Sequence, residues 1–464
     1  MTRYVISGRA GTSDTFEPKL ADHEVLANVD LRVRNEKQRQ DLPEALGFGI
    51  GDALLQACRQ GLTPTDIGVD VLVLAALVYA ADTRVNRSQA SQDQWTRELR
   101  VVVPVSDPAL WDKSSELLAV TLGFLTGDLW CFEFRALPSP HLIPSAGALG
   151  GPAPFDCISL FSGGLDSLIG AIDLLEKGEQ RPLFVSHKGS SAVSKRQEDL
   201  FNALGERYKV EKRRPSGIRL GLFPPSELFE DIEAEPSTRG RSFLFFALAA
   251  MAGSGLGRSF DLWVPENGLI SLNVPLDITR LGSNSTRTTH PFYMHRWNEL
   301  LGALGIPGKL TNPYWDKTKG DMVMGCRNAD VLEALHADSV SCGHPDTARW
   351  GKHEHPHCGT CLPCIIRRAA LRNTPWAGGD GTGYQLPDLA AQPLRAGMAS
   401  EGLQVRGFQM ALHRLAMRPS LARSLVYKPG PLREDVAIVP DLVDVYARGM
   451  AEVGAVLQNV VTVS

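Results

Sequence analysis

This chain lacks the features that mark several specialised classes of protein. Its longest apolar stretch, residues 71–81, is shorter than the roughly 18 residues that a membrane-spanning helix needs. Neither charge is in large excess, because 48 basic residues face 52 acidic ones and the net charge is -4. This balance argues against a nucleic-acid partner. No apolar signal-peptide region follows Met1, so we expect a cytoplasmic protein with no membrane partner.

Cysteine is also scarce: the chain has 8 cysteines among 464 residues, and half of them cluster late in the sequence. This distribution argues against a disulfide framework and favours a reduced cytosolic protein with one metal site. The composition, 43% hydrophobic and 22% charged, is that of a globular protein long enough for two or three domains.

The most informative motif present is Ser-Gly-Gly-Leu-Asp-Ser at Ser162–Ser167. The short apolar stretch before it, residues 157–161, predicts a buried strand, and apolar residues at helical spacing over 168–176 predict a helix. A strand, a glycine turn and a helix start together form a cradle for anions. Glycine permits positive φ there, and the backbone N–H groups and helix dipole favour negative charge. The serine hydroxyls can donate to phosphate, and Asp166 is placed to hold Mg²⁺ or a hydroxyl group.

This loop is not the common phosphate-binding loop, which needs a lysine followed by serine or threonine after its second glycine. It resembles the PP-loop of ATP pyrophosphatases, which split ATP into AMP and pyrophosphate. The alternative is a glycine turn that only joins a strand to a helix. The PP-loop resemblance implies that ATP and Mg²⁺ are bound by Ser162, Gly163, Gly164, Leu165, Asp166 and Ser167.

A second signature is a C-x15-C-x2-C-x2-C array formed by Cys342, Cys358, Cys361 and Cys364. Four thiolates suit tetrahedral Zn²⁺ in a closed, structural site; unrelated thiols are the alternative. The histidines of the same stretch are expected to support the site or face solvent. We expect this zinc knot to hold residues 343–357 beside the active site.

Composition and periodicity divide the chain into four parts. Residues 1–136 are predicted to form an α+β recognition or assembly domain, and residues 137–154, with five prolines, a linker. Strands alternate with helices over residues 155–375, which predicts an α/β domain with a parallel sheet and ligands at the carboxyl ends of its strands. Residues 376–464 are predicted to be mostly helical. Three polar residues of the first part are expected to be exposed surface groups: Asp82, Arg84 and Arg87.

Three further segments extend the resemblance: Gly240-Arg241-Ser242, the segment Asn312–Lys319, and the segment His357–Arg368 around the last three cysteines. With the loop, they resemble the 7-cyano-7-deazaguanine synthase (QueC) family over residues 155–373. The longer chain resembles the QatC-type branch of that family, which belongs to the Qat anti-phage defence systems. The resemblance implies a HUP-type (adenine nucleotide alpha hydrolase-like) fold for the PP-loop domain.

The resemblance also implies a reaction. The carboxylate of 7-carboxy-7-deazaguanine attacks the α-phosphate of ATP, and an acyl-adenylate and pyrophosphate form. An amine then displaces AMP. The family's synthases use ammonia and a second ATP to reach the nitrile. At their second strand end they carry Asp-Tyr-Gly-Gln-Arg-His, where this chain has Ser186-His187-Lys188-Gly189. Such departures favour a changed acceptor, with an amine of a partner protein from the defence operon as the hypothesis and ammonia as the alternative.

Further site residues follow from the matched segments. Ser186 and His187 are expected to border adenine or ribose. The catalytic candidates besides Asp166 are Arg241, Lys317 and Lys319, with surface ion pairing or helix-start solvation as their alternatives. Glu266 is expected to read the guanine-like edge of the substrate, because a carboxylate accepts two parallel N–H bonds, or else to cap the following turn. The remaining substrate-binding candidates, in the next loop segments, are Asn267, Thr286, Arg287 and His290.

Two other classes of function stay open from the sequence. A PP-loop enzyme could thiolate tRNA, for which Cys326 is a weak candidate thiol, while Cys157 is predicted to be buried and inert. A chain without catalysis could serve as a nucleotide-binding scaffold, against which the intact loop argues.

Overall fold

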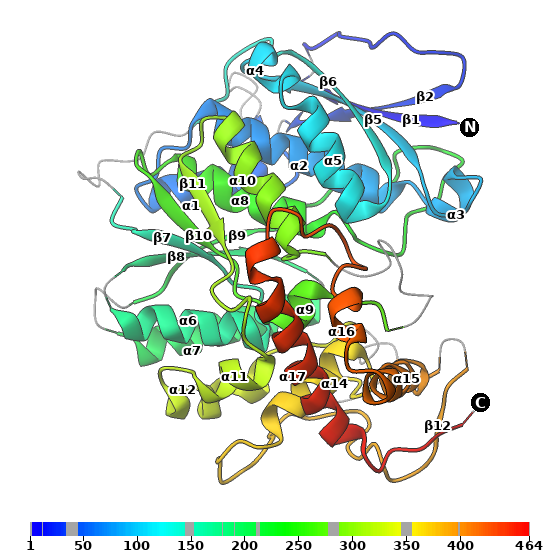
Figure 1. Ribbon diagram of the computed structural model, residues 1–464. Helices are drawn as coiled ribbons and strands as arrows, with labels where there is room; N and C mark the ends of the chain where they lie inside the picture. Colours follow the sequence, from blue (N-terminus) through cyan, green and yellow to red (C-terminus); the bar gives the residue numbers. More distant parts are fainter. Residues whose placement is uncertain are drawn as a thin grey trace.

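The computed structural model contains two larger β-sheets, and helices lie between them and on the outer face of the second (Figure 1). The candidate Thr286 lies outside the described residues. The described residues are 2–11, 13–33, 45–143, 153–178, 180–189, 191–209, 214–276, 287–344, 355–397 and 400–463.

The first sheet has the strand order β2-β1-β5-β6, and every neighbouring pair is parallel. The main sheet of the N-terminal region is therefore parallel, which differs from the α+β expectation, and only the short pair β3–β4 is antiparallel among the described strands of this region. Helices connect β2 to β5 and β5 to β6 and return the chain to the same end of the sheet, as parallel pairing requires. The elements are β1 (Arg3–Arg9), β2 (Glu24–Asp30), β3 (Arg32–Val33), β4 (Ala45–Leu46), α1 (Ile50–Arg59), α2 (Asp66–Arg84), α3 (Arg87–Ala90), β5 (Glu98–Val105), α4 (Pro108–Asp112), α5 (Ser115–Thr126) and β6 (Leu129–Ala136).

The second sheet has five parallel strands in the order β11-β10-β7-β8-β9, which confirms the predicted α/β arrangement. Counted along the chain from β7, this is the order 5-4-1-2-3 of a doubly wound domain. The direction of winding reverses between β7 and β10, so a crevice opens at the carboxyl ends of these two strands. The elements are β7 (Cys157–Leu160), α6 (Leu165–Lys177), β8 (Pro182–His187), α7 (Ser191–Arg207), β9 (Ser216–Leu220), α8 (Arg241–Ser254), β10 (Phe260–Trp263), α9 (Gly268–Leu272), α10 (Pro291–Ala303), β11 (Gly308–Thr311), α11 (Lys319–Met324) and α12 (Ala329–Leu335).

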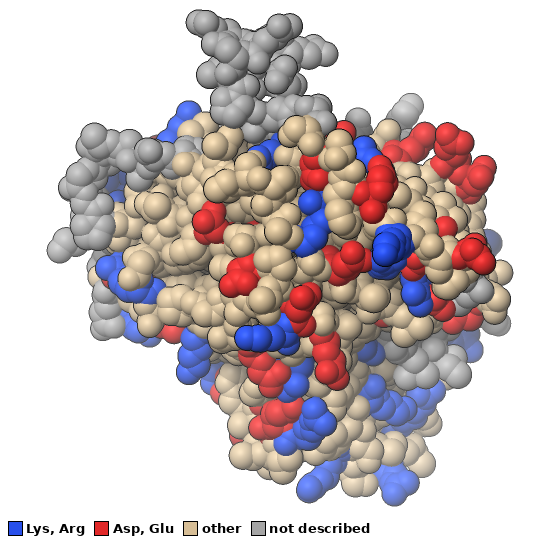
Figure 2. All heavy atoms as spheres, turned by 90° about the horizontal axis from the view of Figure 1, so that it is seen from above, with Lys and Arg blue, Asp and Glu red and all other residues tan. Residues whose placement is uncertain are grey.

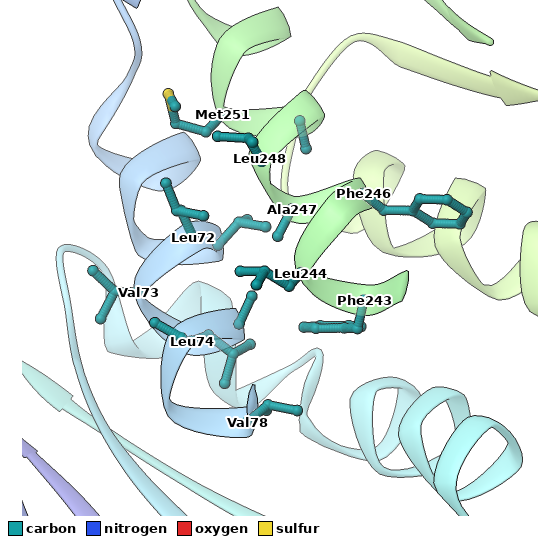
Figure 3. Close-up of a cluster of buried hydrophobic side chains, with 14 of the residues drawn as sticks. Leu72, Val73, Leu74, Val78, Phe243, Leu244, Phe246, Ala247, Leu248 and Met251 are labelled. Atoms are coloured by element: carbon teal, nitrogen blue, oxygen red, sulfur yellow. The ribbon is translucent and has the colours of Figure 1, made fainter. Parts of the chain in front are cut away.

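Helices α2 and α8 pack against each other between the two sheets (Figure 1, Figure 3). Both are apolar around most of their circumference because both are covered: α2 packs on β1 and β5, and α8 packs on β7, β8 and β10. One core therefore runs from Ile6 of the first sheet through Leu74 and Leu244 to Ile158 of the second. Each fully buried leucine of this core contributes about 1.5–3 kcal/mol. The N-terminal region and the second sheet consequently share one interior.

Helices α6 and α7 cover the other face of the second sheet, and β7 alternates between the two cores. Ile158 faces α8, whereas Cys157 and Phe161 pack in the cluster of α6 and α7. Cys157 is fully buried, as predicted, and burial raises the pKa of its thiol to about 12.

The C-terminal part is mostly helical and packs a third core against α9 and α14. Helix α17 carries the apolar stripe seen in the sequence, with Leu442, Val445 and Val453 buried. The elements are α14 (Leu362–Leu371), β12 (Leu394–Arg395), α15 (Leu403–Met417), α16 (Leu421–Leu425), α17 (Val439–Leu457) and β13 (Thr462–Val463).

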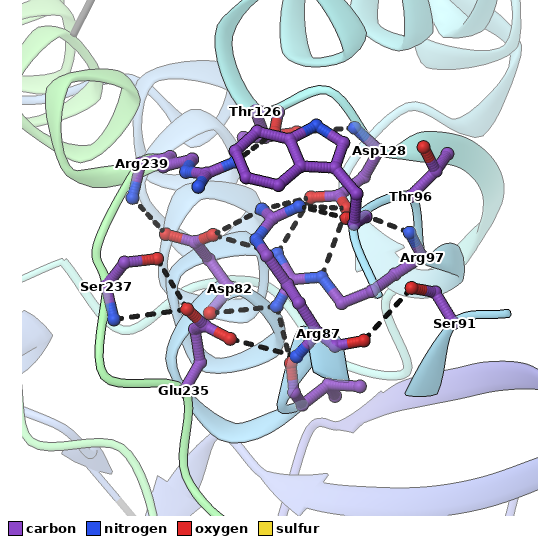
Figure 4. A network of polar contacts seen from close by, with 12 residues as sticks. Asp82, Arg87, Ser91, Thr96, Arg97, Thr126, Asp128, Glu235, Ser237 and Arg239 are labelled. Atoms are coloured by element: carbon purple, nitrogen blue, oxygen red, sulfur yellow. Dashed lines mark hydrogen bonds and ion pairs between the residues drawn. The ribbon is translucent and has the colours of Figure 1, made fainter. Parts of the chain in front are cut away.

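A buried network of four charges lies where α2, β5 and β6 meet (Figure 4). Asp128 accepts paired bonds from Arg87 (2.7 and 2.8 Å), and Arg97 bonds both Asp128 (2.7 Å) and Asp82 (3.0 Å). The expectation that Asp82 and Arg87 are exposed is wrong, because Asp82 is 0% and Arg87 4% exposed. The second oxygen of Asp82 also accepts from the backbone N–H groups of Arg239 and Gly240 at the start of α8. The network thus ties the first sheet to α8.

Charges of both signs alternate over the face shown in Figure 2, so no broad basic surface covers that face. Among the described residues, no helix is both long enough and apolar enough to cross a membrane.

We expect Asp128→Asn to lower the free energy of unfolding by about 3–5 kcal/mol, because it leaves two buried guanidinium groups without their shared carboxylate. Urea denaturation followed by circular dichroism measures this change. The control is Glu17→Gln, which removes an exposed ion pair with Arg9 and should cost less than about 1 kcal/mol. Equal effects of the two variants would contradict the prediction.

Candidate functional site

The candidate site lies at the reversal of the second sheet. The Ser162–Ser167 loop follows β7, and the Glu266–Asn267 turn follows β10, so both leave the carboxyl ends of adjacent strands. Helix α6, after β7, covers one face of the sheet, and α10, the longer helix after β10, packs with α8 on the other face. The two turns border the crevice that ligands occupy in doubly wound folds.

The Ser162–Ser167 loop presents three successive backbone N–H groups. Those of Gly163 and Gly164 donate to serine hydroxyls of the loop itself, Ser167 at 3.1 Å and Ser162 at 3.3 Å. The N–H of Leu165 donates to Ser341, 3.3 Å away. Gly163 has a φ of 81°, a conformation that favours glycine. Consecutive N–H groups with hydroxyl acceptors form a nest that an anion can take over.

Three groups from neighbouring segments hold this loop. Ser186 of β8 and Gln197 of α7 both donate to the carbonyl oxygen of Phe161, each at 2.9 Å. The backbone N–H of Val340 donates to the carbonyl oxygen of Gly163 at 2.9 Å. The loop conformation therefore depends on segments that are distant in sequence.

Asp166, in the first turn of α6, forms a buried ion pair with Lys319 of α11. The Lys319 Nζ lies 2.7 Å from Oδ1 of Asp166, and the Asn267 side-chain amide donates to Oδ2 at 2.7 Å. Both ionic residues are 5% exposed. Burial opposes ionisation of Asp166, but the ammonium group of Lys319 and the hydrogen bonds outweigh it and hold the pKa of Asp166 below its ordinary value.

Glu266 lies beside Asp166, close enough for the two carboxyl groups to affect each other's ionisation. Burial and the neighbouring carboxylate raise the pKa of Glu266 to about 8. Its backbone is held by Asn312, at the end of β11, through bonds of 2.8 and 3.4 Å. Gly170 of α6 permits this close approach, because a Cβ there would lie 2.5 Å from Pro265. Two adjacent carboxylates and a lysine can together hold a divalent cation and a phosphate.

The four cysteines of the array gather into one cluster, in which all four sulfur atoms lie within 4.8 Å of one another. Cys342 and Cys361 have sulfur atoms 3.8 Å apart, and those of Cys358 and Cys364 are 4.0 Å apart. Zinc–sulfur bonds of about 2.3 Å in a tetrahedron place sulfur atoms about 3.8 Å apart, so the donor set fits a metal ion such as Zn²⁺. Backbone N–H groups of Gly343 and Cys361 point at the sulfur atoms of Cys361 and Cys358, as around thiolates.

The cysteine cluster adjoins the glycine loop through residues 340–341. Ser341, directly before Cys342, accepts from Leu165 and donates its backbone N–H to His357 Nε2 at 3.2 Å. Arg367 of α14, 0% exposed, donates to Ser341 at 3.3 Å and to Ser339 at 2.9 Å. A metal ion that held the cysteines in place would therefore also hold Ser341, the acceptor of the Leu165 N–H group.

The two residues expected to border adenine or ribose, Ser186 and His187, lie at the end of β8 and point in different directions. Ser186 faces the loop, whereas the His187 ring lies between Tyr79 of α2 and Phe245 of α8, with ring centres 5.8 and 5.6 Å away. Burial and the charge of Arg241 lower the pKa of His187 to about 3. Arg241 lies against Gly189, where a Cβ would be 3.0 Å from its Nη2. The nucleotide and catalytic roles of these residues stay predictions.

The two lysines of the Asn312–Lys319 segment differ in placement. Lys319 points into the site, whereas the side chain of Lys317 is 51% exposed and lies 3.4 Å from Asp316. Thr318, which lies between the two lysines, caps the start of α11 and forms a capping box with Asp321.

The described residues expected to bind substrate in the 285–291 segment pack against α5. Arg287 donates to the carbonyl oxygen of Phe124 at 2.9 Å, and the His290 ring centre lies 5.2 Å from that of Phe124. Ser271 of α9 donates to the carbonyl oxygen of Thr289 at 2.6 Å, which connects this segment to the helix that follows Asn267. The segment is one helical turn removed from the Asp166 cluster.

Four residues that support the site are absent from the candidates of the sequence analysis: Gln197, Asn312, Ser341 and Arg367. Asn312 and Arg367 lie inside the segments on which the resemblance to the QueC family was based, so the sequence pointed to these two positions. No motif in the sequence points to Gln197 or Ser341, because only the packing of α7 and of the cysteine segment brings these residues to the loop.

The fold and this site define a doubly wound α/β protein whose glycine loop adjoins a four-cysteine cluster that could hold a metal ion. No family model matches the chain, and no curated protein matches it either.

We expect the purified protein to contain about one zinc ion per chain, measured by plasma mass spectrometry. Cys361→Ser should remove most of it and lower the melting temperature, because three thiolates hold the ion less well and the Ser341 segment loosens. The control is Cys131→Ser, at an exposed cysteine outside the cluster, which should keep the zinc. Equal zinc in both variants would exclude the cluster as the metal site.

A second prediction concerns acid stability. His290 is 0% exposed, and burial followed by the Arg287 charge lowers its pKa to about 3. The unfolded chain takes up a proton near pH 6.5 and the folded chain does not, so stability falls as the pH decreases from about 6.5. In His290→Asn, the loss of unfolding free energy between pH 7 and pH 5 should be about 2 kcal/mol smaller than in the native chain. The exposed His413→Asn variant should show the native pH dependence.

Proposed function

We propose that this protein is an ATP-dependent, AMP-forming enzyme that adenylates a 7-deazaguanine carboxylate and transfers it to an amine. The observation that carries the proposal is the meeting of the Ser-Gly-Gly-Leu-Asp-Ser loop with the buried Asp166–Lys319 pair at the sheet reversal. An anion nest, a carboxylate pair and a buried ammonium group are the parts that phosphoryl chemistry requires.

The proposed reaction begins with two anions that repel each other. A substrate carboxylate oxygen attacks the α-phosphorus, and the bond to the pyrophosphate breaks. The glycine loop would bind the departing pyrophosphate. Its hydrogen bonds to serine hydroxyls would break, and hydrogen bonds to phosphate oxygens would form from the serine hydroxyls and from the backbone N–H groups of Gly163, Gly164 and Leu165. Lys319 would offset the growing charge of the pyrophosphate. Asp166 and Glu266 would hold Mg²⁺, which neutralises phosphate charge when bound.

The second step transfers the acyl group. An amine nitrogen attacks the acyl carbon, AMP leaves, and the nitrogen loses a proton. No covalent enzyme intermediate is required, so the described site needs no nucleophilic side chain. Arg241, at the start of α8, would pair with a phosphate or with the substrate carboxylate.

The substrate class rests on the QueC-like motifs. Glu266 lies at the end of β10, where a deazapurine edge could meet it, but its contact with Asp166 favours a cation-binding role over base recognition. This chain extends on both sides of the QueC-like segment, as in the QatC-type branch. That likeness supports a partner protein of an anti-phage operon as the source of the amine. The enzyme would then act in the cytoplasm.

Thiolation of tRNA is disfavoured by the state of the thiols. The clustered cysteines face one another as metal ligands, and burial raises the pKa of Cys326 to about 12, which suppresses the reactive thiolate. The face in Figure 2 also offers no broad basic surface for tRNA.

The test is mass spectrometry of the protein incubated with ATP, Mg²⁺ and 7-carboxy-7-deazaguanine, with ammonia or with a co-encoded partner protein. AMP with a partner heavier by one deazaguanine acyl group would support conjugation. AMP with the nitrile would establish ammonia as the acceptor. Bound ATP without AMP would leave a scaffold and refute the enzyme.

We expect Lys319→Met to slow AMP formation by about 100–1000-fold, because the buried ammonium group is lost from the pyrophosphate end. Lys317→Met is the matched control two residues away, and its exposed side chain predicts a change of less than about fivefold. Similar rates for the two variants would remove Lys319 from the mechanism.

A further inference from the structure

We propose that Glu452, in the C-terminal helix α17, is a positioning residue that holds Lys319 against Asp166. The catalytic meaning of this inference rests on the proposed function, whereas the placement itself can be tested without it.

Glu452 contacts the residues on both sides of Lys319. Its carboxylate accepts from the Thr318 hydroxyl and lies directly against the backbone of Gly320. Gly320 leaves room for this contact, since a Cβ there would lie 2.6 Å from Oε1 of Glu452. One carboxylate thus contacts the residues directly before and directly after Lys319, through a hydrogen bond at Thr318 and through close packing at Gly320.

Arg448, one helical turn before Glu452, holds the same segment from its other side. It donates to the Asp321 carboxylate of the capping box and, at 3.0 Å, to the carbonyl oxygen of Asp316. Helix α11 has only six residues, so it cannot be stable alone and takes its position from such contacts.

Helix α17 is itself anchored close to the site. Its apolar stripe packs on α9 and α14, and Gly449 lies so close to Leu269 that a Cβ would approach it to 2.9 Å. Helix α9 begins directly after Asn267, the second partner of Asp166. One helix therefore supports both residues that bind the Asp166 carboxylate. Because charge stabilisation depends on distance, a small shift of Lys319 would slow the reaction without changing substrate binding.

The experiment labels lysines of the native and variant chains with an amine-reactive acetylating reagent and reads Lys319 and Lys317 by peptide mass spectrometry. Lys317 is the internal reference, because its side chain is 51% exposed and that of Lys319 is 5% exposed. Glu452→Ala should raise the ratio of Lys319 to Lys317 labelling about fivefold, the effect of one lost hydrogen bond on local opening. Glu452→Gln, which keeps a carbonyl acceptor, should restore most of the protection.

Two further variants separate positioning from general loosening. Gly320→Ala pushes the Glu452 carboxylate away without removing any hydrogen-bonding group, and it should raise the same ratio even if Glu452→Ala fails to fold. Asp441→Ala is the control, since Asp441 is an exposed residue in the first turn of α17, on the same helix as Glu452. An unchanged ratio in Glu452→Ala and Gly320→Ala, or an equal rise at both lysines, would overturn the inference.

The catalytic arm measures AMP formation by the same variants. Glu452→Ala should lower kcat about tenfold with less than a twofold change in KM for ATP, as expected when only transition-state contacts weaken. A change confined to KM would refute the positioning role. Failure of the native chain to form AMP would refute the proposed function, and the labelling ratio would still decide whether Glu452 places Lys319.

Discussion

The ion pair between Asp166 and Lys319 is the contact on which the site depends. Both residues are 5% exposed, and a charge removed from water is tolerated only when it is paired and hydrogen-bonded. The start of α6, the start of α11 and the turn at Asn267 must therefore meet at one point. That point coincides with the reversal of the second sheet, where backbone geometry already leaves a crevice between β7 and β10. A lone lysine or carboxylate could not remain there.

The cysteine cluster supports this arrangement without entering the crevice. Its thiols face one another, while the residue before Cys342 supplies the acceptor for one N–H group of the glycine loop. The buried Arg367 connects the same segment to α14, which follows the last cysteine. A metal ion bound by the four sulfur atoms would thus act on the anion nest through the rigidity of one short segment. This is a structural use of a closed tetrahedral site.

The two terminal parts of the chain are integrated with the central sheet. Helix α2 shares its core with α8, and Asp82 both balances Arg97 and accepts two backbone N–H groups at the start of α8. At the other end of the chain, α17 packs on α9 and α14 and contacts the residues around Lys319. Residues outside the segment that resembles the QueC family therefore set the positions of residues inside it. The extensions are part of the architecture of the site.

Patterns within short segments of the sequence determined the alternation of strands and helices around the second sheet and two constellations: the glycine loop between β7 and α6, and the four cysteines. These could be predicted because a loop motif and a metal array are encoded within a few tens of residues, and hydrophobic periodicity reports which faces are buried. Tertiary structure alone decided that Lys319 and not Lys317 meets Asp166, that Glu266 lies against a second carboxylate, and that Asp82 and Arg87 are buried. It also decided that the first sheet is parallel, since pairing depends on how the connecting helices return the chain. The physical reason is that a side chain's charge state and exposure depend on segments far away in sequence, whose approach is fixed only by packing.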